Sequence, residues 1–408
     1  MQCGLLGRKL GHSYSPQIHS YLGDYTYCLF EKEPEELENF LKYGDFSGIN
    51  VTIPYKKEVI PYLDTLSPTA RKMGSVNTVV RRPDGTLFGH NTDYFGFTSL
   101  VHHAGLSVAG KKVLVLGSGG TSNMAVTALK DLGAEPVVIS RSGENNYGNL
   151  YLHRDAGVIV NATPVGMYPN TGACPIDLTL FRHLEGVLDV IYNPARTQLL
   201  LNAEKMGIPC ENGLWMLVAQ AKEASEVFTG NKLPEDSIRT IYRTLTHQMK
   251  NIVLIGMPGC GKTTIGTLLA EKLGRPMKDA DELIIRLAGK SIPEIFAQDG
   301  EPAFRDWETQ ALSQLGKQSG LILATGGGCI TQPQNYPLLH QNGYLIWLER
   351  DTAKLPTQGR PLSQRTDLDD MYRRRRPLYE AFADIRVDNS GTPQDTVNKI
   401  LAALEELP

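Results

Sequence analysis

The 408-residue sequence predicts an α/β fold built from parallel sheets flanked by helices. Short apolar runs alternate with helical patterns along the chain, which is typical of doubly wound sheets. Two of these runs, 113–116 and 252–255, each lead directly into a glycine-rich turn followed by a helical pattern. Because such a turn places a helix N-terminus beside a bound phosphate, the chain is predicted to hold two separate phosphate sites.

Composition excludes several classes of function. The formal net charge is −3, and the hydrophobic content of 41% is ordinary for a globular protein, so we expect no nucleic-acid or membrane partner. Six cysteines without a C-x-x-C pair argue against a zinc site or a disulfide framework and favour the cytoplasm. The four arginines at 373–376 could form a solvated helix face or an RNA patch, and their isolation on an acidic chain argues against nucleic acid.

The alternation of patterns places the elements in chain order. Runs of apolar residues predict strands at 3–7, 48–53, 77–80, 113–116, 137–139, 157–160, 188–191 and 252–255. Apolar residues at helical spacing predict helices over 124–132 and 214–228, a polar helix ending near His247, and a helix after the second glycine turn.

The second glycine turn, from Gly256 to Thr264, matches the phosphate-binding pattern G-x-x-x-x-G-K-[ST]. Gly259 and Gly261 lack a Cβ, so the backbone N–H groups can approach the phosphates closely. Lys262 supplies a positive charge, and the Thr263 hydroxyl can bind Mg²⁺. We therefore expect an ATP site formed by Gly259, Cys260, Gly261, Lys262, Thr263 and Thr264.

Several polar motifs follow one another in the first half. His12-Ser13-Tyr14-Ser15-Pro16 places two hydroxyls where they can bind one carboxylate, although alone it reads as a serine-rich turn. The motifs 50–56, 75–78 and 91–93 come next, each with an asparagine beside a threonine or valine. In this order and spacing, residues 1 to 230 resemble shikimate dehydrogenase.

The resemblance implies a catalytic pair, Lys56 and Asp93. Reduction of a ketone requires a hydride and a proton, and a lysine held by a carboxylate can deliver that proton. The resemblance also implies that Ser13 and Ser15 bind the substrate carboxylate. The further substrate ligands that it implies are Thr52, Asn77, Asp93, Tyr192 and Gln220.

The first glycine turn is similar to the nucleotide turn of the same family. Arg141 follows the strand at 137–139, where an acidic residue would favour NAD and a cation favours the 2′-phosphate of NADP. A second cation is missing here, so NADP is favoured by a reduced margin and an NAD-dependent quinate dehydrogenase stays open. The expected NADP ligands are Gly117, Ser118, Gly119, Gly120, Thr121, Ser140, Arg141 and Gly213. The crossover after Arg141 is unusually short, which should change the edge of this domain.

The second half carries a further set of motifs, and residues 250 to 408 resemble shikimate kinase by the whole set. The set comprises the P-loop, Lys278-Asp279-Ala280-Asp281, the run 300–308, Gly326-Gly327-Gly328, Gly359-Arg360-Pro361-Leu362 and Arg375-Arg376-Pro377-Leu378-Tyr379. The resemblance implies that Asp281 binds a ring hydroxyl, that Asp279 reaches Mg²⁺ through water together with Thr263, and that Arg360 meets the ATP phosphates. The substrate ligands that it implies are Asp281, Arg305, Gly326, Gly327, Gly328 and Arg375.

Two departures concern ATP. The segment from Arg350 to Arg360 lacks an arginine that often stacks near adenine, with Lys354 as the nearest cation, and the tail at 388–393 lacks an expected arginine. ATP affinity could therefore be weaker, while the residues expected to perform the chemistry are present.

We therefore expect a bifunctional enzyme of aromatic amino-acid biosynthesis that uses NADP(H), ATP and Mg²⁺ on the small molecules 3-dehydroshikimate and shikimate. Residues 1–101, completed by a helix over 214–245, are expected to bind the dehydrogenase substrate, residues 102–213 to form a Rossmann-like NADP domain, and residues 249–408 to form the P-loop kinase. One alternative is that either half is an inactive scaffold or a regulatory domain.

Overall fold

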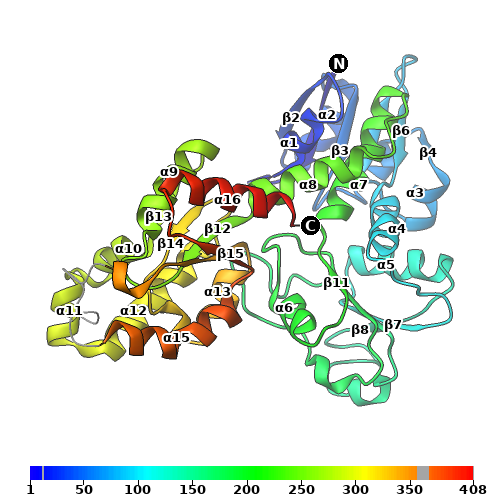
Figure 1. Ribbon diagram of the computed structural model, residues 1–408. Coiled ribbons are helices and arrows are strands. Elements are labelled where there is room, and N and C mark those ends of the chain that lie inside the picture. Colours follow the sequence, from blue (N-terminus) through cyan, green and yellow to red (C-terminus); the bar gives the residue numbers. More distant parts are fainter. Residues whose placement is uncertain (12, 356–366, 408) are drawn as a thin grey trace. The chain divides into compact units, whose positions relative to one another are not determined.

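The structure, a computed structural model, describes residues 1–11, 13–355 and 367–407. The chain folds into two compact units. The N-terminal unit comprises Met1–Val165, Cys174–Tyr192 and Asn202–Thr244, and the C-terminal unit comprises Gly166–Ala173, Asn193–Leu201 and Leu245–Pro408. Each unit is built around parallel strands, so the predicted α/β class is confirmed (Figure 1).

The first sheet of the N-terminal unit has six strands in the order β2-β1-β3-β5-β6-β4. Its strands are β1 (Gln2–Gly7), β2 (Thr26–Glu31), β3 (Gly48–Val51), β4 (Thr65–Leu66), β5 (Thr78–Arg81) and β6 (Leu87–His90). Strands β1, β2 and β3 are parallel, whereas β5 runs antiparallel to both β3 and β6. The sheet is mixed because a tight turn joins β5 to β6, with Gly85 at a φ of +87° that favours glycine.

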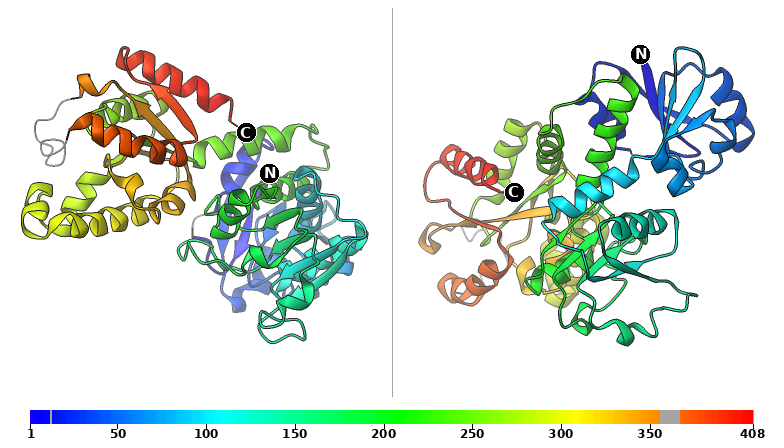
Figure 2. Two further views of the ribbon diagram at one scale, coloured as in Figure 1. Left: turned by 60° about the horizontal axis from the view of Figure 1, so that its bottom comes forward. Right: turned by 90° about the vertical axis from the view of Figure 1, so that its right-hand side faces the viewer.

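Helices pack around this sheet and position its polar residues. They are α1 (Ser15–Ser20), α2 (Leu37–Tyr43), α3 (Pro68–Met73), α4 (Asp93–His103) and α7 (Leu214–Thr229). Helix α7 returns from late in the unit and packs against α4 and α1. Its contact with α4 brings residues more than 100 positions apart in the sequence to one end of the sheet (Figure 2).

The second sheet of the N-terminal unit is entirely parallel, in the order β11-β10-β9-β7-β8. It contains β7 (Lys112–Leu116), β8 (Glu135–Ile139), β9 (Val158–Asn161), β10 (Gly186–Asp189) and β11 (Cys210–Glu211), and helix α5 (Gly120–Asp131) packs against β7 and β8. Helix α6 (Gln198–Lys205) begins in the C-terminal unit and ends in the N-terminal unit. Between β8 and β9 the chain forms only a 3₁₀ turn, Leu150–His153. The short crossover predicted from the sequence therefore leaves β8 as an edge strand of the sheet.

Helix α8 (Ser237–Met249) leads into the C-terminal unit, and Lys250 alone separates it from β12 (Asn251–Ile255). The sheet there is parallel, in the order β13-β14-β12-β15-β16, with β13 (Met277–Asp279), β14 (Ile322–Ala324), β15 (Gly343–Glu349) and β16 (Ile385–Asp388). Helices flank the sheet (Figure 1): α9 (Lys262–Leu273), α10 (Ala280–Ala288), α11 (Ile292–Gln298), α12 (Gly300–Leu315), α13 (Asn335–His340), α15 (Leu368–Phe382) and α16 (Pro393–Glu405).

Among the described residues, no helix is long and apolar enough to cross a bilayer.

The two units should unfold separately, because each has a buried core of its own. Leu254 in β12 and Leu114 in β7 are both fully buried. Leu254→Ala should lower the stability of the C-terminal unit by about 2–5 kcal/mol, and Leu114→Ala should do the same to the N-terminal unit. Urea unfolding, monitored by amide hydrogen exchange in each unit, measures both effects. If either variant destabilises both units equally, the units fold as one.

Candidate active sites

Lys56 and Asp93 form an ion pair in the N-terminal unit. Lys56 lies in the turns after β3, and Asp93 is the first residue of α4, where the helix dipole favours a negative charge. The Lys56 ammonium donates to Asp93 Oδ2 at 2.5 Å, and the two side chains are 32% and 14% exposed. The structure thus places the two predicted catalytic residues in contact while leaving the lysine accessible.

Asn77 connects the strands to α7. Its amide nitrogen donates to Thr92 Oγ1 at 3.0 Å and to Gln220 Oε1 at 3.3 Å, and its oxygen accepts from the Thr92 backbone at 2.7 Å. Asn77 is almost fully buried. These bonds bring the predicted ligands Asn77 and Gln220 together beside the start of α4, one residue before Asp93.

The two predicted serines lie at the start of α1. The Ser15 backbone N–H donates to Ser13 Oγ at 3.2 Å. A hydrogen bond from Ser15 opposes the rise in the pKa of Tyr27 that burial causes, so the two side chains are neighbours. Tyr27 donates to Asn50 Oδ1 at 2.7 Å, and Asn50 in turn donates to Thr78 Oγ1 at 3.3 Å. A polar chain therefore runs from Ser15 toward Asn77.

Sequence reasoning assigned no role to Tyr27 or Asn50. Asn50 stands in the same motif as Thr52 and Lys56, so the motif itself was the available signal. Tyr27 lies on β2, outside the motifs that carry the resemblance, so only the fold shows that it lies beside Asn50.

Thr52 is positioned by strand β1, and Tyr192 is positioned by the segment that carries Ser13 and Ser15. The Thr52 backbone N–H donates to the Leu6 carbonyl at 2.9 Å, which fixes it beside β1. Tyr192 contacts the ring of Tyr14 edge to face, with ring centroids 6.0 Å apart. Tyr14 lies between Ser13 and Ser15, so Tyr192 packs against the segment that carries the serines.

The first glycine turn leads directly into α5. Gly117 has a φ of +108°, which side-chain-bearing residues rarely adopt. Gly119 and Gly120 are exposed, and a Cβ built on either would meet no atom within 4 Å. The protein itself therefore leaves open space at Ser118, Gly119, Gly120 and Thr121, in front of the α5 N-terminus.

The other predicted NADP ligands differ in setting. Arg141 is exposed and follows β8 after Ser140. Burial raises the pKa of Tyr147, and the positive charge of Arg141 partly offsets that rise. Gly213 packs so closely that a Cβ would lie 2.0 Å from the Val190 carbonyl oxygen. Its lack of a side chain is thus required by packing at the start of α7.

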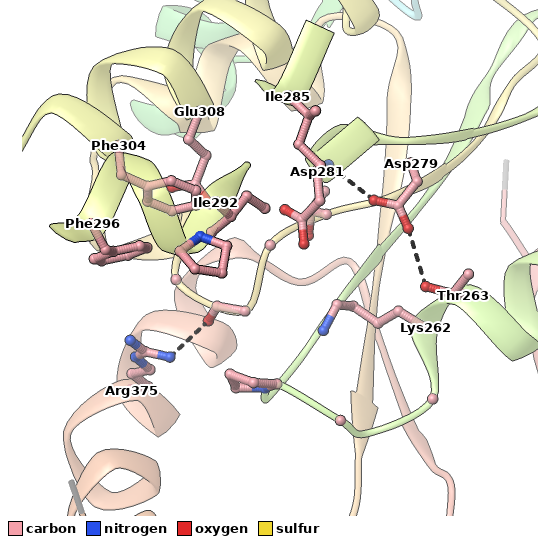
Figure 3. Close-up of a pocket in the computed structure, with 18 of the residues that line it drawn as sticks. Lys262, Thr263, Asp279, Asp281, Ile285, Ile292, Phe296, Phe304, Glu308 and Arg375 are labelled. Atoms are coloured by element: carbon pink, nitrogen blue, oxygen red, sulfur yellow. Dashed lines mark hydrogen bonds between the residues drawn. The ribbon is translucent and has the colours of Figure 1, made fainter. Parts of the chain in front are cut away.

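A cavity of about 830 Å³ occupies the C-terminal unit at the carboxyl ends of its strands (Figure 3). Among its lining residues are nearly all the predicted kinase ligands: Gly259, Gly261, Lys262, Thr263, Thr264, Asp279, Asp281, Arg305, Gly326, Gly327, Gly328 and Arg375. Cys260 is fully buried within the P-loop. Arg360 lies outside the described residues.

The P-loop has the backbone that its glycines predict. Gly259 and Gly261 have φ values of +81° and +104°. Lys262 is largely buried and donates to the carbonyls of Gly256 and Met257 at 2.9 and 3.1 Å. The Asn389 amide donates to the Cys260 carbonyl at 2.5 Å and so ties the loop to the end of β16, a role that the sequence did not reveal.

Three polar side chains meet at the start of α10. Thr263 Oγ1 donates to Asp279 Oδ2 at 3.1 Å, and Asp279 Oδ1 accepts from the Asp281 backbone at 2.9 Å (Figure 3). Asp281 Oδ1 is buried without a hydrogen-bond partner among the described residues. Burial, with added repulsion from Asp279 and Glu308, raises the pKa of Asp281 to about 6.

Arg305 lies in an acidic setting on α12. It donates to Glu308 at 2.8 Å and to Glu301 at 2.9 Å, and it is 7% exposed. Glu308 is fully buried, its Oε1 has no partner among the described residues, and burial raises its pKa. Arg375 donates to the Gly327 carbonyl at 3.2 Å (Figure 3). The two predicted carboxylate-binding arginines therefore line the same cavity.

The three consecutive glycines pack against three different neighbours. A Cβ added to Gly326 would lie 2.4 Å from the Glu308 side chain. One added to Gly327 would lie 2.6 Å from the Pro258 side chain, and one added to Gly328 would lie 2.4 Å from the Arg305 guanidinium. Any side chain at these positions would displace cavity residues.

Several lining residues were not assigned from the sequence: Pro258, Ile285, Ser291, Ile292, Pro293, Phe296, Phe304, Glu308, Thr325, Arg350 and Lys354. Phe304 and Glu308 stand in the run 300–308 that carries Arg305, so the motif contained them. The side chains of α11 show only an ordinary helical pattern, and the cavity alone identifies them.

Comparisons with known proteins agree with this architecture. Residues 5–79 match the family model described as shikimate dehydrogenase substrate binding domain, and residues 258–405 match the one described as shikimate kinase. A shikimate dehydrogenase (NADP(+)) of Clostridium perfringens is 35% identical over 264 residues, which cover 59% of this chain and 97% of the relative.

Solved structures give the same result. Shikimate dehydrogenase 1 of Peptoclostridium difficile is 38% identical with a TM-score of 0.55, and the match covers 60% of this chain and 97% of that one. A quinate dehydrogenase of Corynebacterium glutamicum, solved with NAD, is 27% identical with a TM-score of 0.55, over 60% of this chain and 98% of that one. The chain thus belongs to the shikimate dehydrogenase family and, with its C-terminal shikimate kinase domain, is a bifunctional shikimate-pathway enzyme that uses NADP and ATP.

Proposed function

We propose that the N-terminal unit reduces 3-dehydroshikimate to shikimate with NADPH and that the C-terminal unit phosphorylates the 3-hydroxyl of shikimate with MgATP. The observation that carries the proposal is that each unit brings its own set of chemistry-bearing residues together. Lys56 contacts Asp93 in one unit, and Lys262, Asp281, Arg305 and Arg375 line one cavity in the other.

In the dehydrogenase site, Lys56 delivers a proton to the oxygen of the ketone. NADPH, when bound, supplies the hydride. Asp93 holds the ammonium through the 2.5 Å hydrogen bond and can also accept from a ring hydroxyl. Asn77 and Gln220 are joined at 3.3 Å and offer amide groups to the remaining hydroxyls, while Ser13 and Ser15 bind the carboxylate.

The residues around the first glycine turn fit NADP. Open space before Gly119 and Gly120 leaves the N-terminal amides of α5 available to a pyrophosphate. Arg141 is exposed at the end of β8, where it would meet a 2′-phosphate. Because it is the only cation in the run 140–145, NAD-dependent oxidation of quinate remains the alternative for this unit.

In the kinase site, charge neutralisation and positioning are the main requirements. When ATP binds, the Lys262 ammonium donates to the phosphates in place of the carbonyls of Gly256 and Met257. Arg305 and Arg375 hold the substrate carboxylate through charge-assisted hydrogen bonds. Asp281 accepts a hydrogen bond, and then the proton, from the hydroxyl that is phosphorylated.

The residues present also fit a magnesium ion. The Thr263 hydroxyl and the Asp279 carboxylate are 3.1 Å apart, and both are oxygen ligands of the kind that Mg²⁺ prefers. We expect Thr263 to bind the ion directly and Asp279 to reach it through water.

We further propose the domain division 1–101 with helix 214–245, 102–213 and 249–408, and a cytoplasmic location. The location is supported by six cysteines that are all free thiols. The intact residue sets argue against an inactive scaffold in either half.

One assay on the full chain tests the proposal. Given 3-dehydroshikimate, NADPH, ATP and Mg²⁺, the protein should oxidise NADPH and consume ATP in sequence. Separate reactions with NADH, and with quinate and NAD, decide the cofactor and the alternative substrate. Faster turnover of quinate with NAD would replace the first half of the proposal, and no ATP use with shikimate would refute the second.

Lys56→Ala should lower dehydrogenase kcat by roughly 10²- to 10⁴-fold, the usual contribution of a general acid. Kinase activity should not change. Lys57→Ala is the matched control, because Lys57 is the exposed neighbour. A Lys56→Ala protein with near-parental kcat would remove Lys56 from the mechanism.

Arg375→Ala should weaken shikimate binding by about 10- to 150-fold, equivalent to the 1.5–3 kcal/mol of a charge-assisted hydrogen bond. ATP binding should change little, because the P-loop does not use Arg375. Arg374→Ala changes the exposed neighbour and should have no effect. Calorimetric titrations with shikimate and with an ATP analogue measure both. Arg375 is preferred to Arg305, whose removal would also leave Glu308 buried without its partner.

Asp281→Asn should make the C-terminal unit more stable at pH 7 by about 1–3 kcal/mol. The pKa of Asp281 is raised to about 6 in the folded state, so the folded protein retains a proton that the unfolded chain loses near pH 4. Stability therefore falls as pH rises between about 4 and 6 and stays lower above it. Urea unfolding of both proteins at pH 4 and pH 7 measures the difference.

The exposed Asp306→Asn should behave as the parent at both pH values. An equal gain for Asp281→Asn at pH 4 and pH 7 would show that the ionised carboxylate is not the cause.

A further inference from the structure

A second cavity in the C-terminal unit, of about 350 Å³, has no place in the proposed reactions. It is lined by residues near the ends of α8, α9 and α16 and near the starts of β12 and β15: His247, Lys250, Ile252, Lys272, Leu273, Arg275, Tyr344, Leu401, Leu404 and Glu405. The nucleotide cavity lies at the other ends of these strands. Helix α9 begins there with Lys262 and ends at Leu273, about 18 Å away for twelve residues.

The lining is positively charged. It carries Lys250, Lys272 and Arg275, and Glu405 is the one carboxylate among its described residues. Arg275 donates to two neutral acceptors, the Lys250 carbonyl at 3.0 Å and the His247 carbonyl. Lys272 donates to the Asn398 amide at 2.9 Å. These bonds satisfy donors without cancelling charge.

Three helices end at this cavity, and cations at helix C-termini can be purely structural. That reading accounts for Arg275, whose guanidinium caps α8. The bond from Lys272 to Asn398 uses one of the three donors that an ammonium carries. Lys250 is only 7% exposed, with its ammonium 5.1 Å from the centroid of the Tyr344 ring. Lys272 thus lines this space and keeps donors that capping does not use.

The remaining walls are apolar. Leu273, Leu401, Leu404 and Ile252 line the cavity together with the Tyr344 ring. A few charged groups set in an apolar pocket of this size are typical of sites for small molecules. A ligand that matches both parts has one negative charge and an apolar body.

We propose that this cavity binds a small organic carboxylate with an aromatic or aliphatic body. Its carboxylate accepts a hydrogen bond from Lys272, and its body packs against Leu401 and Leu404. The site is separate from the nucleotide cavity, so its ligand does not compete with shikimate or ATP. The proposal does not depend on the catalytic assignments.

The test uses 3-phenylpropionate as the probe, titrated against the full chain by ligand-observed NMR. Saturating shikimate and an ATP analogue are present so that carboxylate binding in the catalytic cavity is excluded. The matched ligand is 3-phenyl-1-propanol, which keeps the body and lacks the charge. Inorganic phosphate, which has charge without a body, is the third ligand.

Two variants examine the two parts of the site. Lys272→Met should weaken 3-phenylpropionate binding about tenfold, as expected when one charged hydrogen-bond donor is lost. Leu404→Trp fills the apolar part and should abolish binding. Lys399→Met, on α16, removes a cation that pairs with Asp388 and should change nothing.

Saturable binding of 3-phenylpropionate that follows this pattern, with weaker binding of the alcohol and of phosphate, supports the proposal. Three results overturn it: no saturable binding in the presence of saturating shikimate and the ATP analogue, equal affinity for the alcohol, or binding unaltered in both Lys272→Met and Leu404→Trp. Kinase activity of each variant checks that the unit is folded, because neither residue contacts the catalytic cavity.

Discussion

Backbone amides at the start of a helix have no partner within the helix, and this constraint organises both halves of the protein. In each half a largely buried strand, β7 or β12, ends in a glycine turn that opens a helix. Glycine is needed at Gly117, Gly259 and Gly261 because their φ values are positive. At Gly119 and Gly120 no protein atom would meet a Cβ, so there the space serves a ligand. The sheets carry these turns at their carboxyl ends, and in the kinase cavity the P-loop lies among the other predicted ligands.

The kinase cavity contains buried carboxylate oxygens that the described residues leave without a hydrogen-bond partner. Oxygens of Asp281 and Glu308 are buried without partners among the described residues, and the pKa of each carboxyl group is raised by burial. Such groups destabilise a folded domain unless something pairs with them. A bound hydroxyl would supply the missing partner of Asp281. Without substrate, the unpartnered oxygen of Asp281 lowers the stability of the folded domain. The same oxygen would accept the hydrogen bond that binds the substrate hydroxyl, so binding would remove this destabilisation.

Local patterns predicted β1, β3, β5, β7 to β10 and β12, both glycine turns and the motif residues of the kinase cavity, because each is encoded in a short run of consecutive residues. The other strands, among them β2, β6, β14, β15 and β16, were not predicted. Hydrogen bonds between distant segments could not be predicted from the local patterns. The hydrogen bond from Asn77 to Gln220 joins positions 143 residues apart. The bond from Tyr27 on β2 to Asn50 on β3 crosses β1, which lies between them, and so depends on the strand order. The short crossover was visible in the sequence, but that it leaves β8 at an edge depends on strand order. The second cavity draws on three helices and two strands, whose lysines and leucines look ordinary one at a time.

One of the crossings between the two units falls inside α8. In α8 the buried residues are Ile238, Ile241, Leu245 and Met249, a single stripe at helical spacing. The unit boundary lies between Thr244 and Leu245, so the stripe gives its first two residues to one unit and its last two to the other. Only Lys250 then precedes β12, and its carbonyl is held by Arg275. At this crossing the helix continues from Ser237 to Met249 without an intervening loop. Changes in the length of α8 should therefore be tolerated much less than changes in the loops of either unit, because they would rotate one half of the stripe relative to the other.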